Sequence, residues 1–137
     1  MDLKRARAFI LEHHRGVLAT RRSGGGIRQS PIVAAVDDDG LIVISSRETA
    51  YKVRYLRADP WAQVCMFPDG FFGPWVWVEG RAAILSLPDA MEPLVDYRRR
   101  FTDAAALDWD AYRERMVQER RVLIRIHAER AGPDQQG

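Results

Sequence analysis

Short apolar runs broken by turn residues dominate the pattern along the chain, and they predict mainly strands. Each run is rich in strand-forming residues, and all but the run at 41–45 end close to Gly, Pro or Asp. Pro31 lies inside the second run and cannot donate to a ladder, so we expect an edge, a bulge or free backbone there. The pattern predicts six strands, at residues 16–22, 28–36, 41–45, 62–67, 75–87 and 121–130.

Apolar residues at helical spacing predict four helices, over residues 1–14, 49–58, 88–101 and 108–119. Gly16 is expected to end the first helix, and Asp108 to cap the last one. Hairpins follow hairpins without βαβ alternation, which favours a mainly β fold, an antiparallel barrel with peripheral helices. Residues 1–130 are expected to form one domain, followed by a frayed tail at 131–137.

Composition and charge narrow the class of protein. The 137 residues are 47% hydrophobic, enough for a single core, and the net charge of +2 argues against a nucleic-acid partner. No run approaches the ~18 apolar residues that a transmembrane helix needs, and the start of the chain lacks a signal-peptide pattern. One cysteine excludes an internal disulfide. We therefore expect a cytoplasmic protein with no membrane partner.

Several reactive-looking residues have simpler interpretations. The glycines at 24–26 lack the lysine of a phosphate-binding loop and precede a strand, so they predict a hairpin turn. His13 and His14 are adjacent and point to different sides of a helix, so no metal site is expected. Cys65 lies in mid-strand, typical of an inert thiol. The basic runs at 98–100 and 120–121 are interpreted as solvated faces.

One segment favours an anion site. Ser45 and Ser46 end a buried strand, and Lys52 and Arg54 lie in the first turns of the next helix. Two hydroxyls, free helix N–H groups and two cations together suit an anion, although an ordinary helix start with surface cations has the same pattern. Of the 21 basic residues, only Lys4 and Lys52 are lysine.

An aromatic segment follows the fourth strand. Trp75 and Trp77 alternate along the next strand and form a flat apolar wall. Such a wall can be core, a dimer interface or the lining of a pocket for a planar ligand.

The order of motifs resembles a known superfamily. Its motifs lie at residues 16–20 (Gly-Val-Leu-Ala-Thr), 29–31 (Gln-Ser-Pro), 52–60 (from Lys-Val-Arg to Asp-Pro) and 78–82 (Val-Glu-Gly-Arg-Ala). In this order they resemble the pyridoxamine-phosphate-oxidase-like split β-barrel superfamily. Residues 108–113, running into 120–124, are similar to its small actinobacterial branch, which uses the deazaflavin coenzyme F420.

The resemblance implies a homodimer of six-stranded barrels with cofactor sites at the subunit interface. It implies a cofactor ring against the backbone of the second strand and a phosphate-bearing tail at the third strand and following helix. No catalytic residue is assigned by it. The implied cofactor-binding residues are Gln29, Ser30, Pro31, Ser45, Ser46, Lys52, Arg54 and Arg121, with Trp75 as a wall of the substrate cavity.

The sequence also departs from the superfamily pattern. Relatives often have a basic or small residue where Ala50 stands and an asparagine where Tyr55 stands, so one phosphate contact is expected to be missing. The acidic tail of F420 would then depend on a groove lined by arginines, for which the candidates are Arg47, Arg54, Arg57 and Arg121.

The resemblance implies a function in which F420 and a small unsaturated or carbonyl-containing substrate exchange a hydride. Two alternatives remain open: an FMN-dependent enzyme of the pyridoxamine-phosphate-oxidase type, and a non-catalytic protein that binds a cofactor or small ligand.

Overall fold

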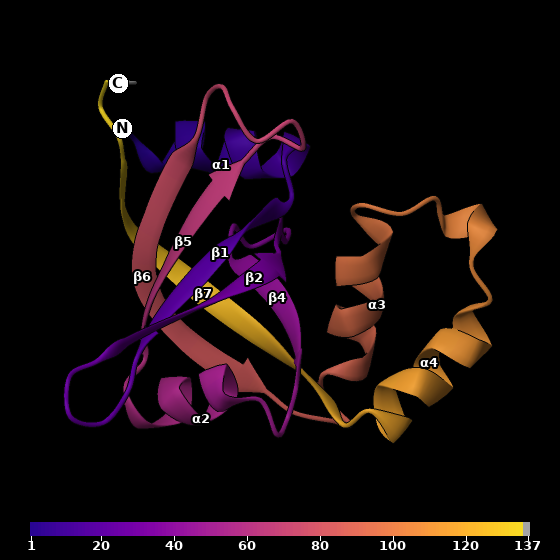
Figure 1. Cartoon of the computed structure of the whole chain (residues 1–137). Helices are drawn as coiled ribbons and strands as arrows, with labels where there is room; N and C mark the ends of the chain where they lie inside the picture. Colours follow the sequence, from indigo (N-terminus) through magenta and orange to yellow (C-terminus); the bar gives the residue numbers. More distant parts are fainter. Residues whose placement is uncertain (136–137) are drawn as a thin grey trace.

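One curled antiparallel sheet organises the chain (Figure 1). The computed structural model describes residues 1–135. The strand order is β2-β1-β5-β6-β7-β4-β3. The strands are β1 (Arg15–Arg21), β2 (Ile27–Val33), β3 (Ala35–Val36), β4 (Ile42–Arg47), β5 (Trp61–Phe67), β6 (Val76–Leu85) and β7 (Arg121–Gly132).

The described residues form seven strands, so the prediction of six was wrong. The run at 28–36 divides at Ala34, whose N–H donates to the carbonyl of His14 at 2.8 Å. Before this break β2 pairs with β1, and after it β3 pairs with β4. One stretch of chain therefore supplies both edges of the sheet, which curls into a barrel. Of the three alternatives expected at Pro31, an edge, a bulge or free backbone, the structure has the edge position, in β2.

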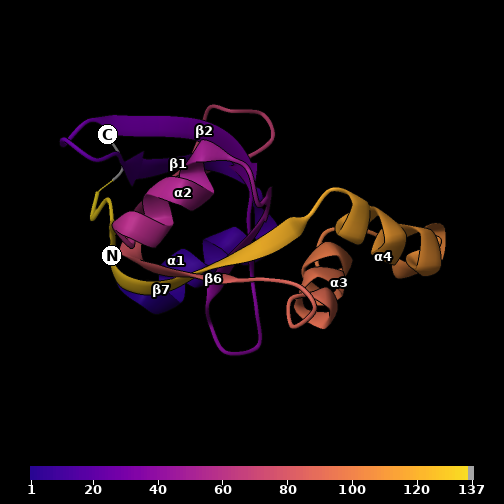
Figure 2. The same cartoon turned by 90° about the horizontal axis from the view of Figure 1, so that it is seen from below.

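Within residues 1–135, four α-helices flank the sheet: α1 (Leu3–Glu12), α2 (Tyr51–Ala58), α3 (Met91–Arg99) and α4 (Trp109–Gln118), with a short 3-10 turn, η1 (Ala104–Ala106). Helices α1 and α2 cover opposite ends of the barrel, whereas α3 and α4 form a lobe beside β4 (Figures 1 and 2). The Asp108 cap is confirmed, since its side chain accepts from the N–H of Ala111 at 3.1 Å.

The first helix ends earlier than predicted. It stops at Glu12, and Gly16 lies inside β1 instead of ending the helix. A Cβ at this position would lie 2.4 Å from the carbonyl oxygen of Cys65 on the neighbouring strand. The absence of a side chain at Gly16 therefore allows β1 and β5 to approach each other closely.

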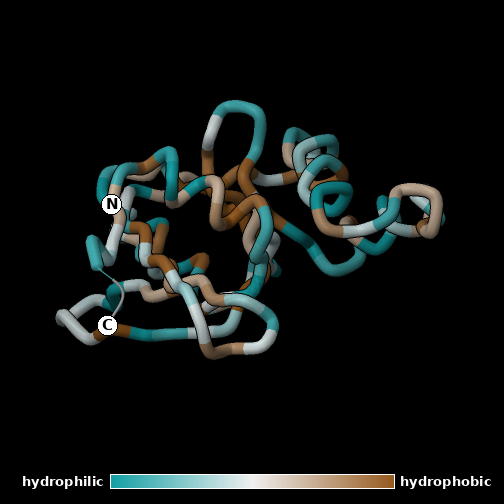
Figure 3. Tube along the Cα trace, turned by 90° about the horizontal axis from the view of Figure 1, so that it is seen from above, coloured by the Kyte–Doolittle hydropathy of each residue, from teal (hydrophilic) through white to brown (hydrophobic). Residues whose placement is uncertain are grey.

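The buried apolar side chains of the described residues form two clusters. The larger fills the barrel, where Leu18, Val64 and Ile124 meet the inner faces of α1 and α2. The smaller lies on the other side of β4 and β7, where Val43 and Leu123 pack against α3 and α4. Both faces of β4 are thus covered, and hydrophobic positions gather inside the molecule (Figure 3).

The last strand extends beyond its predicted end at residue 130. Strand β7 runs to Gly132, so Ala131 and Gly132 belong to the sheet rather than to the tail. A Cβ on Gly132 would lie 2.6 Å from the ring of Trp77. The N-terminal amine pairs with Asp134, which brings the two ends of the chain together. The last two positions of the predicted tail, 136–137, lie outside the described residues.

Candidate functional site

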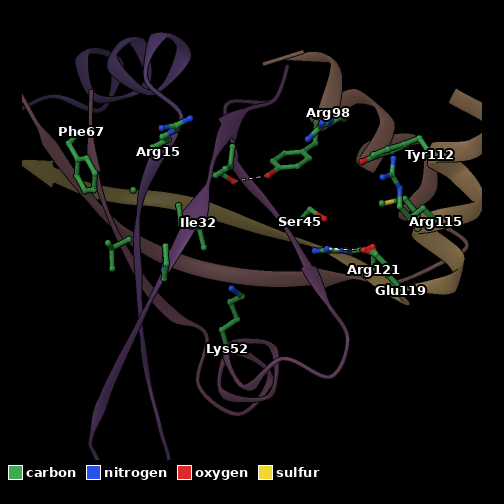
Figure 4. A pocket seen from close by; sticks show the side chains of 16 residues that line it. Arg15, Ile32, Ser45, Lys52, Phe67, Arg98, Tyr112, Arg115, Glu119 and Arg121 are labelled. Carbon is green, nitrogen blue, oxygen red and sulfur yellow. Dashed lines mark hydrogen bonds and ion pairs between the residues drawn. The ribbon is translucent and has the colours of Figure 1, made fainter. Parts of the chain in front are cut away.

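Two neighbouring pockets meet at Lys52. The larger, of about 700 Å³, lies between the sheet and the α3–α4 lobe. The smaller, of about 540 Å³, lies between β2 and α2. Lys52 lines both, and Figure 4 shows it extending from α2 into the larger pocket. Of the four residues that the sequence grouped at an anion, Ser45 and Lys52 therefore line a concavity.

Lys52 has the environment of an anion-binding group. It is half-buried in the first turn of α2, and its Nζ donates to Ser30 Oγ at 3.4 Å. Burial lowers the pKa of its ammonium, and the positive charge of Arg121 adds to that effect. No carboxylate pairs with it among residues 1–135. An anion would therefore stabilise the charged ammonium.

Ser45 and Ser46 point to opposite sides of β4, as successive residues of a strand do. Ser45 lines the larger pocket. Ser46 faces the barrel interior, where it is only 2% exposed and its hydroxyl donates to the carbonyl of Arg47 at 3.3 Å. The structure thus separates two hydroxyls that the sequence grouped at one anion.

Arg121 lines the larger pocket, and one of its N–H groups has no hydrogen-bond partner among the described residues. Its guanidinium donates to Glu119 at 3.2 Å, while its Nε is buried without a hydrogen-bond partner among the described residues. Arg47 reaches the same carboxylate at 3.4 Å. The hydrogen bond from Arg121 holds the pKa of Glu119 below its usual range. Buried donors of this kind favour a ligand acceptor, so the residues fit a phosphate.

The β2 edge connects the two pockets. Gln29 and Ser30 line the smaller pocket, and Pro31 lines the larger one. Among the described residues β2 pairs only with β1, so part of its backbone stays outside the ladder and is available to a planar ligand.

Three predicted residues lie elsewhere. Arg54 is exposed, with its guanidinium carbon 5.5 Å from the centre of the Tyr51 ring, and it lines neither pocket. Trp75 is half-buried just before β6 and also lines neither pocket. Arg57 forms an ion pair with Glu48, so its charge is largely neutralised.

Sequence reasoning missed the helical wall of the larger pocket. Tyr97 of α3 donates its hydroxyl proton to the carbonyl of Val33 at 2.8 Å, and burial raises its pKa to about 12. Tyr112 of α4 donates to the carbonyl of Leu94 at 3.1 Å. The clearest sequence signal was that each tyrosine shares an apolar helix stripe with a neighbour at i−3 or i+4.

The three arginines at 98–100 lie in three different environments, so the interpretation of this run as one solvated face was wrong. Arg98 lines the larger pocket, Arg99 is exposed, and Arg100 pairs with Asp96 at 2.9 Å. Arg15, Arg115 and Arg121 also line the pocket, which makes its wall strongly cationic.

Residues 1–135 contain no group of three or more His, Cys, Asp or Glu side chains placed to hold a metal ion. No helix within those residues has the length and apolar content needed to span a bilayer.

Comparison with known proteins gives consistent matches. The family model described as pyridoxamine 5′-phosphate oxidase matches residues 3–133. A conserved hypothetical protein from Mycobacterium tuberculosis is 25% identical, with a TM-score of 0.74 over 96% of this chain and 82% of its own. An F420 reductase is 20% identical, with a TM-score of 0.68 over 90% and 94%. A Listeria innocua protein named for pyridoxamine 5′-phosphate oxidase is 18% identical, with a TM-score of 0.65 over 96% and 97%.

Proposed function

The chain belongs to the pyridoxamine 5′-phosphate oxidase family, and on that premise we propose that it is an oxidoreductase that uses coenzyme F420. The observation that carries the proposal is the position of Lys52 between two pockets, with Ser45 and Arg121 on one side and the β2 edge on the other. A reductase with that cofactor in its name shares the fold, which supports the choice.

In this proposal, different residues of the site bind different parts of the cofactor. Lys52, Ser45 and Arg121 would hold the phosphate of the cofactor, and the backbone at Gln29 and Ser30 would orient its ring. When bound, F420 supplies hydride transfer to and from a small unsaturated or carbonyl-containing substrate.

Ile32 and the rings of Tyr97 and Tyr112 would exclude water from the space beside the ring. The hydroxyl of Tyr97 keeps its proton and donates it in a hydrogen bond to the Val33 carbonyl, because its pKa is about 12. The side chains of this site would therefore orient the ligands, supply positive charge and exclude water, and Tyr97 would not act as an acid.

FMN is the second candidate cofactor. The family description and the Listeria innocua protein both favour it. Ala50 and Tyr55 line the smaller pocket at the positions where relatives often carry other phosphate contacts, and Arg57 is already paired. Fewer free cations are thus left for an acidic tail, so any preference for F420 should be modest. A third candidate, a cofactor carrier, would bind without turnover.

A homodimer is part of the proposal. Pro31, Val17, Cys65 and Trp77 lie side by side across four strands on the outer face of the sheet. Val17, Cys65 and Trp77 are half-buried, and Pro31 is exposed. This apolar row is suited to contact with a second copy of the chain. Burial raises the pKa of the Cys65 thiol, so it packs there as a neutral group.

Replacement of Lys52 tests the binding site. Lys52→Ala should weaken F420 binding by about 1.5–3 kcal/mol, the usual contribution of a charged hydrogen bond. Lys4→Ala is the matched control, since Lys4 is exposed on α1 and lines neither pocket. Fluorescence titration gives both dissociation constants. An unchanged dissociation constant for F420 in the Lys52 variant would contradict the assignment of Lys52 to the cofactor site.

A further inference from the structure

One carboxylate lies in the cationic wall of the larger pocket. Among the described residues that line this pocket, several are basic and only Glu119 is acidic. A carboxylate repels an anion bound nearby, so by its own charge Glu119 weakens the binding of a phosphate in this pocket. Its contacts indicate a different role.

Glu119 lies at the junction between α4 and β7. It follows the last residue of α4, and its backbone N–H donates to the carbonyl of Arg115 at 2.9 Å. The next residue, Arg120, has a φ of 53°, so the chain turns sharply there before β7 begins at Arg121. The carbonyl of Arg120 accepts a hydrogen bond from the N–H of Glu48 at 2.8 Å, which holds the junction against the end of β4. The backbone is therefore fixed on both sides of Glu119.

The Glu119 side chain contacts two arginines on neighbouring strands. Its Oε1 accepts from Arg121 at 3.2 Å, the bond drawn in Figure 4, and from Arg47 at 3.4 Å. Arg47 and Arg121 are directly opposite each other in the β4–β7 pair, an arrangement in which like charges repel. The side chain of Arg47 is 59% exposed, whereas that of Arg121 is only 25% exposed. The carboxylate therefore offsets the repulsion and holds the less exposed arginine in the pocket.

Only part of the Arg121 guanidinium takes part in this contact. The bond runs from its Nη2 to Oε1, while Arg121 Nε and Glu119 Oε2 are buried without hydrogen-bond partners within residues 1–135. The pair is thus a single hydrogen bond and not the two-bond fork that arginine and a carboxylate often form. Such a contact fixes the direction of the guanidinium and leaves its other N–H groups to a ligand.

We infer that Glu119 is a positioning residue, which holds Arg121 in the orientation in which it binds the phosphate of the cofactor. The inference rests on the proposed function, because that function gives Arg121 its ligand. Glu119 itself does not contact the ligand in this role. A carboxylate that acts only through its own charge weakens anion binding, whereas one that positions Arg121 strengthens it, so the two roles differ in sign.

Fluorescence titration of the whole protein with F420 separates the two roles. Glu119→Ala should lower the affinity about threefold to tenfold, since a displaced Arg121 loses much of its charged hydrogen bond. Glu119→Gln keeps an acceptor oxygen and removes the charge, so its affinity should equal or exceed that of the native protein. Glu114→Ala is the matched control, because Glu114 is exposed on the same helix and lines neither pocket. It should leave the affinity unchanged.

A double-mutant cycle shows whether Glu119 acts through Arg121. In an Arg121→Gln background, Glu119→Ala should no longer lower the affinity. Tighter F420 binding by the single Glu119→Ala variant, or the same loss in both backgrounds, would overturn the inference. Glu119→Asp keeps the charge but withdraws it by one methylene group, so it should also lower the affinity, and it replaces the alanine variant if that one does not fold.

Inorganic phosphate, titrated by calorimetry into the same variants, separates this inference from the proposed function. If F420 does not bind but phosphate does, with the same dependence on Glu119 and Arg121, the positioning role stands and the proposed function fails. If F420 binds and Lys52→Ala weakens it while Glu119→Ala does not, the proposed function stands and the positioning role fails. Absence of binding by both would overturn both.

Discussion

Lys52 combines two properties that give its ligand binding a distinct pH dependence. Burial and the nearby Arg121 lower the pKa of its ammonium, and an anion binds only the protonated form well. Affinity should therefore fall as pH rises through this lowered pKa, and the fall should begin below the range usual for lysine. The dissociation constant of F420, measured from about pH 7 to 10, gives the profile.

Lys52→Arg is the control for that profile, because arginine stays protonated throughout the range. The variant should bind F420 with little pH dependence. Tyr97 cannot mimic the effect, since its pKa of about 12 lies above the range. The same alkaline loss in both proteins would show that another group is responsible.

Gly80 tests how closely β6 and β7 pack at the irregularity between Glu79 and Gly80. A Cβ there would lie 2.0 Å from the carbonyl oxygen of His127, and the other near atoms are also backbone. Gly80→Ala should therefore lower the free energy of unfolding by about 1–3 kcal/mol, as overpacking does. Gly70→Ala is the control, because nothing lies within 4 Å of its added Cβ. Equal urea midpoints for the two variants would contradict this account.

Strand and helix types followed well from the sequence, because alternation and turn residues are local signals. The break at Ala34 did not, since residues 28–36 read as one apolar run and only the change of partner from β1 to β4 divides them. The opposite facing of Ser45 and Ser46 was available from strand alternation. Because of this alternation, the two hydroxyls could not be expected to reach one anion together.

The position of the α3–α4 lobe could not be predicted, because the side on which a helix packs depends on contacts distant in sequence. Tyr97, for example, donates to Val33, 64 positions away. The larger pocket exists only through such contacts, so its tyrosines and Arg98 stood out only once the fold was assembled. The sequence brought Ser45 and Lys52 together because they lie on one local segment, whereas Arg54 of the same segment lines neither pocket.

The proposed dimer predicts a particular mass in solution. If a second copy covers the apolar row on the outer sheet face, light scattering at micromolar concentration should give about twice the chain mass of 15.7 kDa. Four tryptophans in 137 residues add to the apolar surface available for such contact. A mass near 15.7 kDa would contradict the dimer.

The most direct test of the account is a paired titration of the purified protein with F420 and FMN at low and high salt. Both cofactors carry a ring and a phosphate, so Lys52, Ser45 and Arg121 serve either one. The acidic tail of F420 adds a screened attraction to exposed cations outside the phosphate site, such as Arg47 and Arg54. The account predicts tighter binding of F420 at low salt, with a modest preference that shrinks as salt rises. Tighter binding of FMN at low salt, or binding of neither, would contradict it.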